Sequence, residues 1–98
     1  MPFLKYTSAT RGVLWIELGG KPTVIGRSAE CHLRLDDESA SRRHCEVRYD
    51  KGKWYAVDLG SKNGTWVNGV APKAGDALKE GDLITISNSS VKYCENKS

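Results

Sequence analysis

Residues 44–58 read HCEVRYDKGKWYAVD, and this stretch decides the fold class. Cys45, Val47 and Tyr49 place apolar side chains at every second position, which is the period of a strand that buries one face. Residues 50–53 then form a short polar turn with a glycine, and a second strand-like run follows directly. Two such runs joined by so short a turn predict a hairpin of adjacent antiparallel strands.

The same two-residue period recurs on both sides of the hairpin. It is clearest at Leu14, Ile16 and Leu18 and again at Ile84 and Ile86. We predict strands at residues 3–6, 12–18, 23–26, 32–35, 44–50, 53–58, 65–67, 83–87 and 90–95, with very short further strands near 70–72 and 77–79. Turns rich in Gly, Asn and Asp separate these runs, and no stretch has a helical period, so the chain is all-β, a sandwich or a barrel.

The length of 98 residues fits one domain, expected to span 1–98 with a short polar tail at about 95–98. No apolar run approaches the roughly 20 residues that a membrane helix requires, and residues 1–5 do not resemble a signal peptide. The three cysteines are an odd number, which favours reduced thiols in a cytoplasmic or otherwise intracellular protein. The net charge of +3 is too small to select one class of partner.

Three of the longer connections carry cations beside hydroxyl or amide groups. They are residues 26–28 (GRS), 39–44 (SASRRH) and 61–65 (SKNGT), and Asn68 and Gly69 follow the third. Arginine presents a planar fork of donors to an oxyanion, serine adds a hydroxyl, and asparagine can hold a peptide backbone. Together the three clusters predict a site for a phosphate and a peptide.

Each of these residues also has an ordinary structural interpretation. Arg27 is a common type of solvated surface charge, and Ser41 is a common type of turn hydroxyl. His44 begins a strand and fits a hydrogen-bonded structural role, and Asp58 fits a carboxylate that braces its own loop. The acidic run at 36–38 fits a solvated loop or a bias toward basic peptides. No single residue decides between the two interpretations.

Four sequence blocks occur in a fixed order at characteristic separations. They are Gly26-Arg27, then residues 41–44 (SRRH), then residues 58–69 (DLGSKNGTWVNG), then Leu78 with Gly81-Asp82 before a strand. This order closely resembles the forkhead-associated (FHA) domain pattern, from about residue 3 to about residue 94. The resemblance implies an all-β fold, a two-sheet antiparallel β-sandwich of about 10–11 short strands with binding loops at one end. It also implies a module that reversibly binds phosphothreonine in partner proteins, such as Ser/Thr kinase substrates, and needs no cofactor.

The resemblance assigns roles to individual residues. It implies that Arg27 and Ser41 contact the phosphate, that Arg42 helps them, and that Asn63 bonds the peptide backbone. The residues expected to shape the loops are Gly26, His44, Asp58, Gly64 and Asn68. Many family members carry Ser or Thr where this chain has Lys62, so the hydroxyl contact is either replaced by an ammonium contact or lost. We predict Lys62 as a further phosphate ligand.

Metal and catalytic sites are disfavoured by geometry. Cys31-His32 and His44-Cys45 offer zinc ligands, but neighbours on a strand point to opposite faces and lack a spacer. The same adjacency disfavours a hydrolase built from Ser41 or Cys45 with His44. We therefore predict no metal, no catalytic residue and no enzyme.

Two other binding functions stay open. A small β-domain can bind single-stranded nucleic acid by charge and by stacking on Trp15, Trp54 or Trp66, although the last two fall within strands and fit packing positions. The fold can also serve as a phosphate-independent interaction module. The joint presence of Arg27, Ser41 and Asn63 argues against this second function, and we expect neither nucleic acid nor a membrane as the partner.

Overall fold

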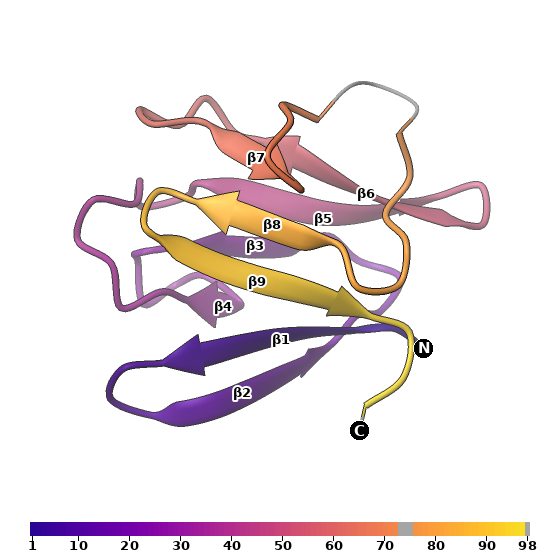
Figure 1. Cartoon of the computed structure of the whole chain (residues 1–98), viewed down its shortest axis with the longest axis horizontal. Coiled ribbons are helices and arrows are strands. Elements are labelled where there is room, and N and C mark those ends of the chain that lie inside the picture. Colours follow the sequence, from indigo (N-terminus) through magenta and orange to yellow (C-terminus); the bar gives the residue numbers. More distant parts are fainter. Residues whose placement is uncertain (73–75, 98) are drawn as a thin grey trace.

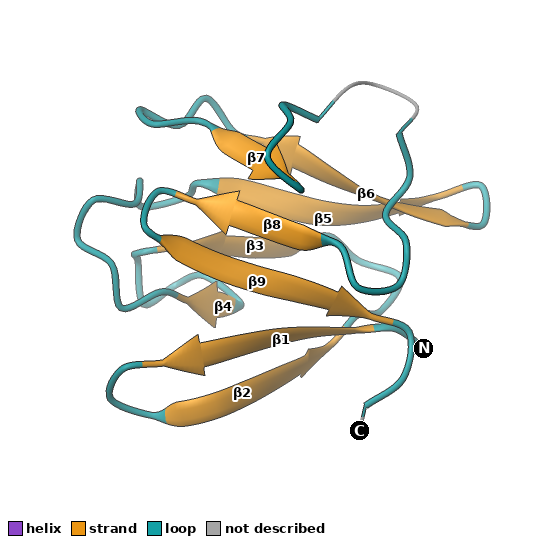
Figure 2. Cartoon of the chain, in the orientation of Figure 1, coloured by secondary structure: helices purple, strands orange, loops and turns teal. Residues whose placement is uncertain are grey.

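The architecture comes from a computed structural model, which describes residues 1–72 and 76–97. These residues form nine strands, as Figures 1 and 2 show. The strands are β1 (Phe3–Ser8), β2 (Gly12–Glu17), β3 (Thr23–Gly26), β4 (Leu33–Arg34), β5 (Cys45–Asp50), β6 (Lys53–Asp58), β7 (Thr65–Val67), β8 (Leu83–Ile86) and β9 (Ser89–Cys94). The described residues contain no helix that is long and apolar enough to span a membrane.

The nine strands form two sheets that pack as a sandwich. One sheet has five strands in the order β2-β1-β9-β8-β7, and the other has four in the order β4-β3-β5-β6. The described pairs are antiparallel except for the short pair of β3 and β4, which is parallel. The predicted two-sheet β-sandwich is therefore confirmed.

Strands β5 and β6 form the hairpin predicted from residues 44–58. Tyr49 lies opposite Trp54, and the register continues without a bulge to the ends of both strands. The two turn residues, Lys51 and Gly52, have φ values of 50° and 86°. Positive φ at both central positions matches the twist of the strands, which is why a short glycine-containing turn fits here.

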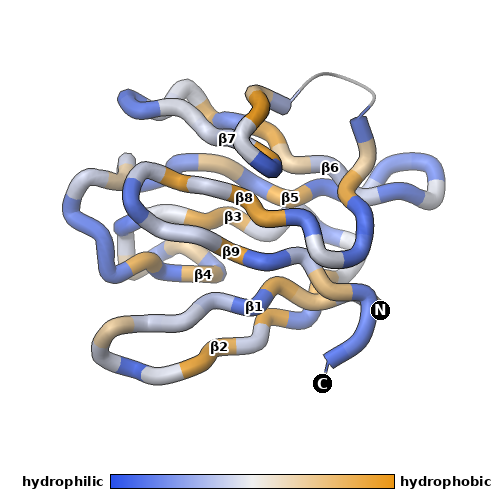
Figure 3. The backbone as a smooth tube through the Cα atoms, viewed as in Figure 1, coloured by the Kyte–Doolittle hydropathy of each residue, from blue (hydrophilic) through white to orange (hydrophobic). Residues whose placement is uncertain are grey.

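The core lies between the two sheets, where side chains of facing strands meet. Leu4, Ile84 and Val91 of the five-stranded sheet are 0% exposed, and so are Ile25 and Val47 of the four-stranded sheet. Figure 3 shows that apolar positions lie along these strands and hydrophilic positions gather in the turns. Full burial of each such side chain stabilises the fold by about 1.5–3 kcal/mol, so a core of this kind can support polar loops that add little stability themselves.

The segments expected as short strands at 70–72 and 77–79 are not strands. The first supplies only an isolated bridge between Val70 and Val67. In the second, the amide of Leu78 donates to a carbonyl of β6. A strand needs a ladder of such bonds, so the described residues hold nine strands, not ten or eleven. The other predicted strands form, with ends displaced by at most two residues.

The three tryptophans occupy different environments. Trp54 is buried in the core, as its packing interpretation requires, whereas Trp66 is 37% exposed, so the packing interpretation is wrong for it. Trp15 is half-buried on β2, where the ring of Phe3 meets it edge to face at 6.2 Å between centroids. The ammonium nitrogen of Lys5 lies 5.4 Å from the centroid of the Trp15 ring. Other side chains of this domain therefore already contact Trp15.

The candidate binding loops gather at one end of the sandwich. The connections β3–β4, β4–β5, β6–β7 and β8–β9 lie at the left of Figure 1, and the two ends of the described chain lie at the right. The predicted arrangement of loops at one end is therefore confirmed.

Candidate functional site

The loop before β5 packs directly against the end of β3. Arg27 N–H donates to Ser41 O at 3.0 Å, and Ser28 N–H donates to Arg42 O at 3.2 Å. A Cβ atom added at Gly26 would lie 2.2 Å from Arg42 O, which no side chain tolerates. Glycine at this position therefore lets the two loops come together.

Ser41 is held on both sides by neighbouring segments. Its N–H donates to His44 Nδ1 at 3.1 Å, and its hydroxyl oxygen accepts a bond from Lys62 N–H at 3.1 Å. Because an amide N–H only donates, Nδ1 accepts and the ring proton sits on Nε2. Nε2 then donates to Gly64 O at 2.7 Å, and the His44 side chain is fully buried. One imidazole thus connects the β4–β5 loop to the β6–β7 loop.

Asp58 holds the β6–β7 loop in shape. Its Oδ2 accepts from the amides of Gly60 and Ser61 at 3.0 and 2.9 Å, and its Oδ1 accepts from the hydroxyls of Ser61 and Thr65 at 2.5 and 2.7 Å. The hydroxyl oxygen of Ser61 also accepts from Gly64 N–H at 2.9 Å. Burial alone raises the pKa of Asp58, but the bonds from Ser61, Thr65 and the amides outweigh it, and the pKa is lowered. The carboxylate is therefore ionised and fully used inside the loop.

A pocket of about 460 Å³ lies where these loops meet. Its lining residues are Arg27, Glu38, Ser39, Ala40, Ser41, Arg42, Lys62 and Asn63. The structure thus brings together Arg27, Ser41, Arg42, Lys62 and Asn63, the five residues predicted to contact a phosphopeptide. Arg27 Nε donates to Ala40 O at 3.1 Å, which anchors the guanidinium at the pocket wall. Glu38 also lines the pocket, but among the described residues ion pairs form only at Arg11 and Arg48, so none of the pocket cations is held in a close ion pair.

Asn63 joins three loops. Its Nδ2 donates to Ser39 O at 2.9 Å and to the hydroxyl of Ser87 at 3.3 Å. Ser87, in the β8–β9 turn, has a φ of 56°. The sequence interpretation missed this turn as part of the site. The polar run of residues 87–90 between two strands was the available signal.

Two carboxylates of the acidic run at 36–38 bond neighbouring turns, although Asp36 is exposed and Asp37 is half-buried. Asp37 Oδ2 accepts from Asn88 N–H at 2.9 Å and from the hydroxyl of Ser89 at 3.0 Å. Burial opposes ionisation of Asp37, but these and other hydrogen bonds lower its pKa. Asp36 accepts a hydrogen bond from Ser8, the largest cause of its own lowered pKa. The run therefore fastens the β4–β5 loop to both neighbouring turns.

Asn68 lies outside the pocket. Its Nδ2 donates to Asp82 Oδ1 at 2.9 Å, and its Oδ1 accepts from Leu83 N–H at 2.9 Å. Its φ of 51° places it in the left-handed region, which asparagine adopts more readily than most residues. These contacts brace the turn after β7 against the start of β8.

The candidate zinc ligands are used in other ways. Both ring nitrogens of His44 are bonded within the protein, and Nδ1 of His32 accepts from Val24 N–H at 3.0 Å. In the described part of the chain, no three His, Cys, Asp or Glu side chains form a group that could hold a metal ion. Burial raises the pKa of Cys45 to about 12, so this thiol stays protonated.

The pattern of loops and the pocket can be compared with known families. The profile of the FHA domain matches residues 23–87, which is more than half of the chain. The chain belongs to the FHA domain family. The matched range contains every candidate residue of this FHA domain, from Gly26 to Asn68.

Several bacterial proteins are similar in sequence to this FHA domain. The oxoglutarate dehydrogenase inhibitor of Corynebacterium efficiens is 45% identical over 64 residues, which are 65% of this chain and 44% of that protein. The FHA domain-containing protein FhaA of Mycobacterium tuberculosis is 41% identical over 68 residues, which are 69% of this chain and 13% of that protein. The chain matches 44% to 50% of the length of its first curated relatives.

Solved structures share the FHA fold over nearly the whole chain. The FHA domain of FhaA, solved in complex with the intracellular domain of Rv3910, is 33% identical with a TM-score of 0.80, over 95% of this chain and 99% of that one. A structure from a study of phosphothreonine-dependent FHA domain interactions is 31% identical with a TM-score of 0.77, over 99% and 98%. The FHA domain of CT664 from Chlamydia trachomatis, at 22% identity and a TM-score of 0.83 over 98% of each chain, supports the fold alone.

Proposed function

We propose that this FHA domain binds phosphothreonine in partner proteins of Ser/Thr kinase signalling, at the 460 Å³ pocket. Membership of the FHA family and the 31% identity to a structure from a study of phosphothreonine-dependent FHA domain interactions support this proposal. The proposed phosphate ligands are Arg27, Ser41, Arg42 and Lys62, and Asn63 is the proposed ligand of the peptide backbone. The supporting observation is that three cations and a serine hydroxyl line one pocket, and no described carboxylate forms an ion pair with them.

The bonding of Ser41 supports its role as a donor. Its hydroxyl oxygen already accepts the N–H of Lys62 at 3.1 Å. The hydroxyl proton is therefore left to donate elsewhere. A phosphate oxygen in the pocket is a strong, charged acceptor for that proton.

The cations contribute in different ways. Arg27 uses Nε for Ala40 O, so its guanidinium is positioned in advance and its remaining N–H groups can form a fork with two phosphate oxygens. Lys62 acts as a flexible point charge, which adds attraction with less geometric definition. The combination favours a dianion over a single carboxylate.

The energetics suit reversible binding. A phosphothreonine carries about −1.5 to −2 charges at neutral pH, and each charge-assisted bond contributes about 1.5–3 kcal/mol. Three or four such bonds sum to about 5–12 kcal/mol before the cost of association and of ordering the peptide is subtracted, so they supply at most about −8 kcal/mol, which corresponds to a micromolar Kd. A contact of this strength can follow the phosphorylation state of its partner.

The domain acts as a regulatory binding module, and we assign it no catalytic residue. His44 cannot serve Ser41 as a general base, because Nδ1 faces the Ser41 amide and Nε2 faces Gly64 O. Cys45 is a buried, protonated thiol and therefore a poor nucleophile. An intracellular site of action, with a phosphorylated protein as the partner and without a membrane or nucleic acid, is part of the same proposal.

Calorimetric titration with an oriented phosphothreonine peptide pool tests this function. The same pool with phosphoserine or unmodified threonine is the ligand control. We expect micromolar binding to phosphothreonine alone, abolished in Arg27→Ala and in Ser41→Ala with little change in Tm. Arg43→Ala is the matched protein control, since it removes an exposed cation next to Arg42 that does not line the pocket.

Three other results of these binding experiments would contradict the proposed function or one of its residues. Equal binding of phosphorylated and unmodified pools would make the domain a phosphate-independent module. Steeply salt-dependent binding of a single-stranded oligonucleotide without peptide binding would favour the nucleic-acid function. A large fall in Tm for Arg27→Ala would show that this residue supports the fold and would remove it from the ligand set.

A further inference from the structure

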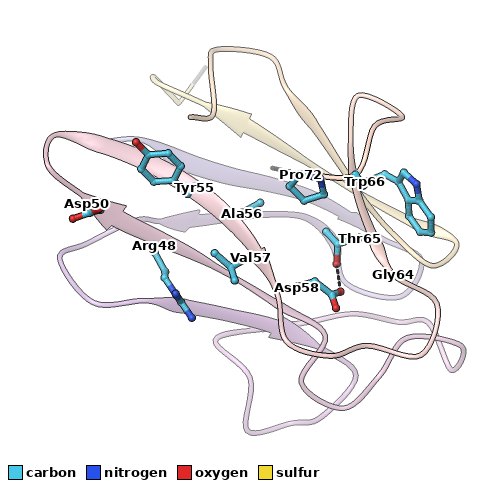
Figure 4. Close-up of a pocket in the computed structure, with 11 residues that line it drawn as sticks. Arg48, Asp50, Tyr55, Ala56, Val57, Asp58, Gly64, Thr65, Trp66 and Pro72 are labelled. Atoms are coloured by element: carbon cyan, nitrogen blue, oxygen red, sulfur yellow. Dashed lines mark hydrogen bonds between the residues drawn. The ribbon is translucent and has the colours of Figure 1, made fainter. Parts of the chain in front are cut away.

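A second concave surface lies on the flank of the sandwich, along the outer edge of β6. It is a groove of about 700 Å³, within the range of clefts that hold ligands. At this flank, β6 ends the four-stranded sheet and β7 ends the five-stranded sheet. The apolar residues that line the groove are Tyr55, Ala56, Val57, Trp66, Ala71 and Pro72. Figure 4 shows the β6 side chains on one side and Pro72 and Trp66 on the other.

Two of the three charged residues that line the groove, Arg48 and Asp58, are bonded within the domain, and the third is Asp50. The Asp58 carboxylate accepts bonds from Ser61 and Thr65, and the Arg48 guanidinium pairs with Glu46. Trp66, in contrast, is 37% exposed. Apolar surface that stays open to water beside satisfied polar groups favours an apolar occupant.

The backbone of β6 also faces this groove. Leu78 N–H donates to Trp54 O at 2.7 Å, so the carbonyl of Trp54 points away from β5. Peptide groups alternate along a strand, so Ala56, two residues later, presents its N–H and C=O to the same side. Ala56 lines the groove. An extended peptide can therefore pair with β6 and place alternate side chains on the apolar lining.

The groove and the pocket proposed for the phosphate are lined by adjacent residues of one loop. Asn63 lines the pocket and Gly64 lines the groove, and adjacent Cα atoms are about 3.8 Å apart. Two side chains hold the loop that carries both residues. Asp58 accepts a hydrogen bond from Ser61 N–H, and His44 donates one to Gly64 O. A chain that leaves the pocket can enter the groove by crossing this one loop.

We propose that the groove binds an apolar, extended segment of the phosphorylated partner, a few residues from its phosphothreonine. This proposal rests on the proposed function, because the phosphate anchors the partner beside the groove. The carbonyl of Trp54 already accepts Leu78 N–H, and the four residues of β6 beyond it, 55–58, span roughly 13 Å. A partner segment of that length can pair with this part of the strand. The groove then adds affinity and selectivity for longer partner segments. Binding measurements with short phosphopeptides do not detect this contribution, because such peptides do not reach the groove.

Phosphothreonine peptides of two lengths test the proposal by calorimetry. The short pool varies only the residues beside the phosphothreonine, and the long pools add six residues, as many as β6 contains. The added residues alternate valine and threonine in one version and glycine and serine in the other, at either end of the peptide. We expect one of the two valine–threonine extensions to lower the Kd about tenfold, as the burial of one or two apolar side chains predicts.

Variants of the groove connect that gain to the site. Val57→Asp and Ala71→Glu should remove the gain and leave the affinity for the short pool unchanged. Ala71 is exposed in a loop, so its variant keeps the test valid even if Val57→Asp lowers the stability of the fold. Val13→Asp is the matched control, because Val13 is 51% exposed on β2 and does not line the groove.

The outcomes separate this proposal from the proposed function. Failure of the short pool to bind would refute the phosphothreonine site itself. Binding of the short pool with no gain from either valine–threonine extension would refute the groove alone. A gain that is equal for glycine–serine extensions, or that persists in Ala71→Glu, would also overturn it.

Discussion

The imidazole of His44 donates to the carbonyl oxygen of Gly64 at 2.7 Å and connects two loops that are 20 residues apart in sequence. The same ring accepts the amide of Ser41 at 3.1 Å, so one buried side chain sets the positions of a proposed phosphate ligand and of the loop that carries Lys62. The arrangement is a structural support for the site and leaves the ring without a free nitrogen for chemistry.

His44→Ala should lower both stability and phosphopeptide affinity. The change leaves Ser41 N–H and Gly64 O without their partner, and each unpaired buried group costs about 1–3 kcal/mol. We expect the free energy of unfolding to fall by about 2–5 kcal/mol, measured by urea denaturation. The exposed His32, which accepts one backbone bond, gives the comparison, and His32→Ala should cost less. An unchanged unfolding curve for His44→Ala would show that the His44 side chain does not stabilise the fold.

Gly26→Ala should separate the two loops that form the pocket. The added Cβ would lie 2.2 Å from Arg42 O, and this atom belongs to the backbone, which cannot turn aside as a side chain can. We expect a loss of about 1–3 kcal/mol in stability, together with weaker phosphopeptide binding. Gly20→Ala has open space around its Cβ and should behave like the unmodified domain. Equal effects of the two substitutions in thermal melts would contradict this account.

Asn68→Ala should destabilise the fold while the affinity for phosphopeptide changes little. The side chain holds Asp82 and the amide of Leu83, and its positive φ disfavours alanine. We expect a loss of about 1–3 kcal/mol in the free energy of unfolding. Calorimetry at a temperature well below the Tm checks the affinity. A Kd raised as far as in Ser41→Ala would mean that Asn68 acts on the pocket directly.

The stability of the domain should fall in acid. The folded-state pKa values of Asp58 and Asp37 are lowered, whereas an unfolded aspartate titrates near a pKa of about 3.9. The unfolded chain therefore takes up protons first, and the stabilisation is complete above pH about 4–5 and lost as the pH falls through the folded values. Urea midpoints measured from neutral pH downward report this loss, and Asp58→Asn should make the dependence shallower. A decline that begins near neutral pH would point to other groups.

The cysteines should resist alkylation while the domain is folded. Burial raises the pKa of Cys45 to about 12 and also raises the pKa of Cys31. Cys94 is 5% exposed. Iodoacetamide at mildly alkaline pH should therefore modify the native domain slowly and the urea-unfolded chain quickly, as mass spectrometry can follow. Rapid modification of one thiol in the native state would identify a local opening at that residue.

The strands could be predicted because the signals that define them are local. The hairpin of β5 and β6 follows from a two-residue period and a short turn, and both act within a few neighbours. The prediction of strands near 70–72 and 77–79 is wrong because pairing of a short segment depends on which backbone groups lie beside it in the folded chain. The local sequence does not determine those neighbours. Val70 forms an isolated bridge with Val67, and a single bridge is not a ladder of hydrogen bonds.

The site was predictable only in part, for a similar reason. The order of the blocks around Arg27, Ser41 and Asn63 carries the family pattern, and the structure brings these residues to one pocket. Their contact with a phosphopeptide stays a prediction. The link from Asn63 to Ser87 spans 24 residues and depends on how the two sheets are stacked. No short-range pattern in the sequence contains that information.

The ends of the described chain lie opposite the binding loops (Figure 1). A tether attached at either end therefore leaves the pocket facing solution. The domain can be immobilised on a sensor surface in one uniform orientation, or joined head to tail in an engineered array, and each copy keeps its loops accessible. Two copies joined by a flexible linker would bind a doubly phosphorylated protein with higher avidity than either copy alone.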